Sequence, residues 1–193
     1  MSDDERDDSD GTRGQAVVLD VLPHGRTEDD RPQYQKQPVG FALDTEEFVL
    51  YEMIVADDAD IAIGDYFDLY DAGFAERVNE VDYDDLPSGA RSELDYAVED
   101  VVDDNEQRFV DFYNDAQPIT LRLHQLNLLP GIGKKLRNTI LDERERKPFE
   151  SFEELESRVG GLHSPKETLV ERILEEIKED DLKYRTFVRR DEQ

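Results

Sequence analysis

Apolar residues in the N-terminal part of the chain gather in short runs that polar turns separate. The runs are rich in valine, leucine and aromatic residues, as half-buried β-strands are. We interpret four of them as strands: 15–22, 39–43, 48–54 and 66–70. Short strands at this close spacing predict a small antiparallel β-barrel, similar to an OB or S1 fold, over residues 15–82. A simple β-meander sheet fits the same pattern.

In the middle of the chain, apolar residues recur with a helical period instead of gathering in short runs. The segment 74–87 is acidic and irregular, and Ser88 is a plausible N-cap for the helix that follows. Apolar residues then recur at three- and four-residue spacing from Leu94 to Tyr113, opposite an acidic face. We therefore predict a connecting amphipathic helix within residues 83–118, with its apolar stripe in the core.

The last third of the chain is predicted to be a helical domain over residues 119–181. Its expected helices are 119–128, which leads into a Pro-Gly turn, then 134–146, 152–159 with Ser151 as N-cap, and a last helix that Ser164-Pro165 begins. Residues 182–193 are expected to form a final strand or a docked tail. Residues 1–14 have no large apolar residue except Met1, and we expect them to be a disordered acidic tail.

The net charge of −27 is distributed unevenly. Acidic residues are spread along the whole chain, but residues 119–149 hold seven basic residues and three acidic ones. A net-positive stretch in so acidic a background indicates a site for an anion. Chance clustering is the plainer alternative.

The dispersed acidic excess, with only seven lysines, is typical of a protein that works in very high salt. In about 1 M salt the Debye length is about 3 Å, so self-repulsion costs little there. An acidic protein that mimics nucleic acid or binds basic partners is the alternative interpretation.

Several classes of site are excluded or disfavoured by composition. The chain has no cysteine, which excludes disulfides and thiolate metal sites. Its three histidines, His24, His124 and His163, have no ligand spacing and are expected to be surface or satisfied polar residues. There is neither an apolar run long enough for a membrane span nor a secretory signal pattern. We expect a cytoplasmic protein without a metal, a cofactor or a membrane partner.

The strongest motif is the string from Leu129 to Lys135, which matches the helix-hairpin-helix pattern. Pro130 fixes φ for a tight turn, and the glycines at 131 and 133 permit positive φ and close approach of a ligand. Ile132 is expected to pin the turn between two helices. The first N–H groups of the second helix lack internal partners and form an anion site that the helix dipole favours.

The predicted nucleic-acid-binding residues are therefore Leu129, Pro130, Gly131, Ile132, Gly133, Lys134, Lys135 and Arg137. Such contacts reach phosphates and do not read sequence. A plain helical hairpin with a glycine-rich turn is the alternative. A weaker second copy of the motif follows at Val159-Gly160-Gly161-Leu162, where nearby acids argue against equal phosphate contact. Aromatic residues of the β domain are a further candidate surface for stacking bases, although core packing is the simpler expectation.

With these motifs placed, residues 15–190 resemble the archaeal DUF655 family. The resemblance rests on Leu-Pro-Gly-Ile-Gly-Lys-Lys at 129–135 and on Lys-Pro-Phe-Glu-Ser-Phe at 147–152. It implies an α+β protein that joins a small N-terminal β domain to a C-terminal helix-hairpin-helix domain, in a haloarchaeal member. It also implies binding of RNA rather than DNA, in translation or ribosome biogenesis.

We therefore expect a non-enzymatic nucleic-acid-binding protein, with RNA favoured and with ribosomal or transcription proteins left open as further partners. An enzyme such as a glycosylase or nuclease would need a catalytic lysine, aspartate or carboxylate cluster, and none stands out from the acidic background. The competing hypothesis is a protein-interaction adaptor that holds a basic partner through its acidic half.

Overall fold

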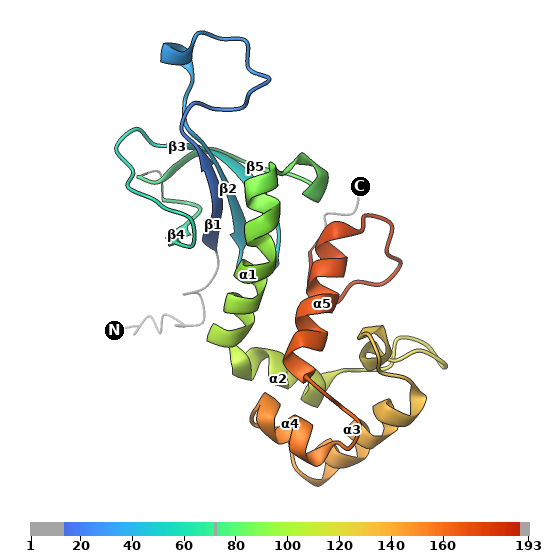
Figure 1. Cartoon of the computed structure of the whole chain (residues 1–193). Helices are drawn as coiled ribbons and strands as arrows, with labels where there is room; N and C mark the ends of the chain where they lie inside the picture. Colours follow the sequence, from blue (N-terminus) through green and yellow to red (C-terminus); the bar gives the residue numbers. More distant parts are fainter. Residues whose placement is uncertain (1–13, 72, 190–193) are drawn as a thin grey trace, which may run out of the picture. The chain divides into compact units, whose positions relative to one another are not determined.

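The structure is a computed structural model that describes residues 14–71 and 73–189 (Figure 1). The chain divides into two compact units, and the boundary between them falls after Ala97. Unit 1 comprises the described residues up to Ala97 together with Arg189, and unit 2 is Val98–Val188. The predicted disordered tail, residues 1–14, lies outside the described residues except for Gly14.

Unit 1 contains a five-stranded antiparallel sheet that curls into a half-barrel (Figure 1). In spatial order its strands are β4 (Tyr66–Asp68), β1 (Gln15–Leu22), β2 (Val39–Asp44), β3 (Leu50–Val55) and β5 (Ala75–Glu80). The register shifts between Val18 and Asp20 in β1 and between Glu52 and Ile54 in β3. Such irregularities increase the local twist and bend of a strand, which suits a curled sheet.

The predicted antiparallel β domain is confirmed, whereas the finer prediction of an OB- or S1-like barrel is not, because the sheet is a half-barrel. The two edge strands, β4 and β5, do not pair with each other. β5 was also missed, because the segment 74–87 was expected to be irregular. Only Ala75 of its six residues is buried, and Arg77 has φ of 49°, so the strand lacks the apolar alternation that marks half-buried strands.

The central strand β2 is buried along its whole length, which shows that both faces of the sheet are covered. One face carries a core cluster that includes Val18, Met53 and Phe67. The first part of α1 (Ser88–Asp104) runs along the sheet in Figure 1, and its Ala90, Leu94 and Ala97 are buried at helical spacing. Two 3₁₀ turns, η2 (Gln33–Gln35) and η3 (Tyr83–Asp85), complete the unit.

Unit 2 is helical, as predicted for the C-terminal part of the chain. Its elements after α1 are α2 (Glu106–Asp115), the 3₁₀ turn η4 (Gln125–Leu128), α3 (Lys134–Arg146), α4 (Phe152–Arg158) and α5 (Pro165–Lys178). The single connecting helix predicted within residues 83–118 is instead two helices, α1 and α2. They separate at Asn105, whose side-chain amide donates to the Val101 carbonyl, a local bond by which asparagine competes with helical pairing.

The helix predicted over 119–128 is reduced to η4. Residues 118–124 form a tight turn in which Pro118 pairs with His124 and the Thr120 hydroxyl accepts the N–H groups of Arg122 and Leu123. Threonine can offer the backbone such an alternative to a helix, which the apolar spacing does not reveal.

The later helices begin and end close to their predicted bounds. The Ser151 hydroxyl accepts the Glu154 N–H at 3.0 Å and caps α4. Ser164 precedes α5 as predicted, but its side chain makes no capping hydrogen bond. Residues 182–188 do not form the alternative strand. They are a docked segment that the carboxylate of Glu176 holds through the N–H groups of residues 186–188.

Candidate functional site

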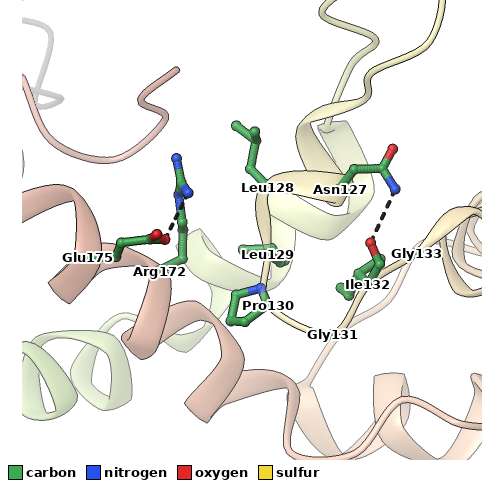
Figure 2. Close-up of a pocket in the computed structure, with 9 residues that line it drawn as sticks. All are labelled: Asn127, Leu128, Leu129, Pro130, Gly131, Ile132, Gly133, Arg172 and Glu175. Carbon is green, nitrogen blue, oxygen red and sulfur yellow. Dashed lines mark hydrogen bonds and ion pairs between the residues drawn. The ribbon is translucent and has the colours of Figure 1, made fainter. Parts of the chain in front are cut away.

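The residues Leu129–Gly133 form a tight turn between η4 and α3, which we call the Pro-Gly turn (Figure 2). The Leu129 N–H donates to the Leu126 carbonyl at 3.3 Å, and the Ile132 N–H donates to the Leu129 carbonyl at 3.2 Å. The side chains of Leu129 and Ile132 are buried. The turn is therefore anchored by two apolar residues, while its glycines lie on the outside.

The two glycines of the turn serve different purposes. Gly131 has φ of 79°, a conformation that side-chain-bearing residues rarely adopt. Gly133 has φ of −85° and ψ of −172°, so it does not use the positive φ that glycine permits. A Cβ added at either position would have no neighbour within 4 Å. Neither backbone strain nor packing within the described residues therefore requires glycine at 133.

The start of α3 is exposed, since Gly133, Lys134 and Lys135 all lie at the surface. Gly133 is the N-cap residue of this 13-residue helix and offers no side chain to the first N–H groups. The first N–H groups of any helix lack intrahelical acceptors and carry the positive end of the helix dipole. The absence of a Cβ at Gly133 leaves these donors accessible to an anion.

The predicted cations divide into two free lysines and one fixed arginine. Lys134 and Lys135 are exposed, and neither has an ion-pair partner among the described residues. Arg137 instead donates to the side-chain oxygens of Asn127 at 3.0 Å and Asn138 at 3.2 Å. The lysines are available to a ligand, whereas Arg137 also braces the turn.

Asn127 connects the parts of the site, and sequence reasoning did not single it out. Its amide nitrogen donates to the Ile132 carbonyl at 3.2 Å, as Figure 2 shows. Its amide oxygen accepts the His124 N–H as well as Arg137. Asn127 therefore connects the residue before η4, the Pro-Gly turn and the arginine beside it. An asparagine near a turn is too common a feature for this role to be recognised from the sequence.

His124 supports the hydrogen-bond network around Asn127. The ring is buried, and Nδ1 accepts the Leu126 N–H at 3.1 Å, so it caps η4 as a neutral imidazole. Burial lowers the pKa of His124 below its ordinary 6.5, and the positive charges of Arg144 and Arg137 lower it further. The expectation of a satisfied polar histidine is met.

The lowered pKa of His124 predicts a specific pH dependence of stability. Below pH 6.5 the unfolded chain takes up a proton on this ring before the folded protein does, so the histidine's contribution to stability is lost as pH falls through that range. His124→Asn keeps an N-cap acceptor but cannot titrate. We expect the difference in unfolding free energy, wild type minus variant, to decrease from pH 7.5 to 5.5 in urea titrations. A pH-independent difference would contradict this account.

An open hollow lies against the Pro-Gly turn, on the side that faces α5. Arg172 and Glu175 line it opposite Leu128, Leu129 and Pro130 (Figure 2). Arg172 is buried, and it donates to the Glu175 and Glu176 carboxylates at 2.9 and 3.0 Å. Its charge is thus compensated within α5, which leaves the exposed lysines as the free charges of the site.

The weaker second copy of the motif has the same backbone arrangement, which we call the Gly-Gly turn (Val159–Leu162). The Leu162 N–H donates to the Val159 carbonyl at 3.2 Å, Gly161 has φ of 91°, and both Val159 and Leu162 are buried. Its surroundings differ, because Glu153 and Glu156 are exposed on the adjacent α4 and no lysine comes within four residues after Gly161.

The described residues contain no group of three or more histidine, aspartate or glutamate side chains placed to hold a metal ion. No helix in the described ranges combines the length and apolar character that a membrane span requires.

Comparisons with known proteins cover nearly the whole chain. The family model described as "Protein of unknown function (DUF655)" matches residues 12–189. Uncharacterized protein MJ0038 of Methanocaldococcus jannaschii is 39% identical over 179 residues, which are 90% of this chain and 79% of that protein. The crystal structure of Af1531 from Archaeoglobus fulgidus, described with the family model DUF655, superposes with a TM-score of 0.83 at 35% identity and covers 91% of this chain and 99% of that one. The chain belongs to the DUF655 family.

Proposed function

We propose that this protein is a non-enzymatic nucleic-acid-binding protein whose helix-hairpin-helix element grips phosphates through the Pro-Gly turn. In this proposal η4, the turn and α3 are the element, with its first helix shortened to one 3₁₀ turn. The single observation that carries the proposal is the open backbone at Gly133, where outward N–H groups meet two unpaired lysines.

The glycine at 133 is best explained by a ligand that approaches the main chain. Its dihedral angles suit any residue, and no neighbour would oppose a Cβ. A phosphate oxygen within hydrogen-bonding distance of the N–H groups would, however, exclude a side chain there. Glycine is then required by the bound state and not by the fold.

The charges around the turn support the same ligand. In a chain with net charge −27, unpaired lysines at 134 and 135 expose positive charge where most other cations have carboxylate or carbonyl partners. A phosphate backbone is an abundant anion that amides and lysines contact without reading sequence. We propose RNA as the preferred nucleic acid.

We further propose that binding takes place in high salt, to which the dispersed acidic surface suits the protein. Counterion release then contributes little to the affinity. Directed hydrogen bonds from main-chain amides would supply much of it, which makes the exposed backbone at Gly133 central.

Gly133→Ala is the sharpest test of this function. We expect the variant to bind labelled RNA at least about 10-fold more weakly than wild type, because a methyl group displaces a phosphate from the amides and a lost charge-assisted hydrogen bond costs about 1.5–3 kcal/mol. Folding should lose no more than about 1 kcal/mol, which is roughly the amount by which alanine is a poorer N-cap residue than glycine. Fluorescence anisotropy in KCl buffer, with single-stranded RNA and duplex DNA as probes, measures both affinity and preference.

Gly160→Ala is the matched control. This glycine belongs to the Gly-Gly turn and also has no neighbour within 4 Å of an added Cβ. We expect unchanged binding, because no lysine flanks that turn. Failure of the wild type to bind either nucleic acid would refute the proposed function, and equal affinity of Gly133→Ala and wild type would refute the contact at the turn.

One observation favours the adaptor function as a second candidate. Residues 57–71 contain six aspartates and no basic residue, and the same segment exposes Ile63 and Tyr70. Carboxylates beside apolar and aromatic side chains suit a lysine- or arginine-rich protein segment. Capture of a basic peptide that Tyr70→Ala abolishes, in a protein that binds no nucleic acid, would favour this alternative.

A further inference from the structure

The turn at residues 118–124 projects a leucine into solvent from an ordered backbone. The Ile119 and Thr120 N–H groups both donate to the Leu123 carbonyl, at 2.8 and 3.0 Å. The Gln125 N–H donates to the Gln117 carbonyl, and the Gln117 N–H donates to the side-chain oxygen of Gln125 at 2.7 Å. These bonds close the turn at its base and fix the residues at its tip.

Leu121 stands at that tip with a relative exposure of 106%. Burying a leucine side chain is favourable, so a turn that holds one fully in water forgoes this gain. The other large apolar side chains with more than 60% exposure are tyrosines, whose hydroxyl groups water can solvate. Within the described residues, folding gives no reason for leucine at 121.

The charge beside Leu121 indicates what the tip meets. Arg122 is exposed, and its side chain has no partner among the described residues. The turn stands at the start of the net-positive segment 119–149. Leu121 is ten residues before Gly131 and belongs to the same unit. An apolar tip next to a free guanidinium suits a polyanion with flat apolar faces between its charges, which describes stacked bases and their phosphates.

We propose that Leu121 is a wedge that enters the base stack of a bound nucleic acid, with Arg122 on an adjacent phosphate. This inference rests on the proposed function and adds a second point of contact to the Pro-Gly turn. Apolar side chains that enter a base step partly unstack it, at a cost that the additional contacts must offset. The turn is ordered before binding, so little conformational entropy is lost when it inserts.

The experiment uses the full chain and an RNA stem-loop that carries 2-aminopurine, whose fluorescence rises when its stacking is lost. Wild type is expected to raise the fluorescence. Leu121→Ala should abolish the rise and weaken binding about 10-fold, whereas Leu121→Phe should retain both, because an aromatic ring can also enter a stack. Tyr96→Ala, which removes another exposed large side chain, is the control and should behave as wild type.

The outcomes separate the two levels of the proposal. If the wild type does not bind the RNA, the proposed function fails. If it binds and Leu121→Ala retains the same affinity and the same fluorescence rise, the wedge is refuted while the Pro-Gly turn keeps its function. If wild type binds with no fluorescence change at any labelled position, Leu121 does not enter the stack, and a protein partner for the tip becomes the better hypothesis.

Discussion

Replacing Glu176 with alanine is expected to lower the free energy of unfolding by about 3–5 kcal/mol, because it removes one partner from a buried charged network. Glu176 is completely buried in α5. Its carboxylate accepts the Arg172 Nε–H at 3.0 Å and the N–H groups of Thr186, Phe187 and Val188 at 2.8–3.0 Å. The variant leaves these donors without an acceptor and releases the segment after α5.

Glu175→Ala is the matched control for this prediction. Glu175 is the preceding residue on the same helix and also pairs with Arg172, but it is about half exposed. Exposed ion pairs contribute about 0–1 kcal/mol. Urea unfolding should therefore separate the two variants by several kcal/mol, and limited proteolysis should cleave near residue 185 first in Glu176→Ala. Equal stability of the two variants would show that the buried carboxylate does not hold the segment.

Reversing both lysines of the site, Lys134→Glu with Lys135→Glu, is expected to weaken RNA binding at least about 100-fold at about 0.2 M salt. Two attractive charges become repulsive at the position where the phosphate is proposed to lie. The plot of log affinity against log salt should also lose about one to two units of slope, which is the signature of lost phosphate contacts. Both lysines are exposed and unpaired, so the fold should be unaffected.

Lys36→Glu with Arg77→Glu makes the same change in net charge in unit 1. We expect a loss of less than about 3-fold for this control, since long-range repulsion is screened beyond about a Debye length. Binding is measured over a salt series in which circular dichroism reports that all proteins remain folded. Equal losses for the two double variants would mean that overall charge, and not the Pro-Gly turn, governs affinity.

The parts of the fold that the sequence predicts are those that a single periodicity determines. β1 was predicted with its observed bounds, α3 and α4 within about a residue, and α5 with its observed start, because valine- and leucine-rich runs, proline and glycine mark them clearly. β5 was missed because it is an edge strand with only one buried residue, so it lacks the apolar residues by which a strand is recognised in the sequence. The OB- or S1-like barrel is not confirmed, because the closure of a sheet depends on whether two distant edge strands meet, and no local pattern encodes that.

The site shows the same division between local and distant determinants. The Pro-Gly turn, its buried Ile132 and its lysines follow from a short contiguous motif. Asn127 and Arg172 act through partners that only the folded chain brings close, so their residue types carried no signal. Arg137 was predicted as a nucleic-acid-binding residue, and its bonds to Asn127 and Asn138 also let it brace the turn.

The Gly-Gly turn has a consequence for protein engineering. It has the same main-chain hydrogen bond and positive-φ glycine as the Pro-Gly turn, but different flanking side chains. The chain therefore carries two similar turns, one flanked by lysines and one by glutamates. Exposed lysines placed beside the Gly-Gly turn would give it the charge of the Pro-Gly turn. A protein with two phosphate-binding turns would gain affinity because the second contact is intramolecular. The distance between the turns would then set the minimum length of nucleic acid that can reach both.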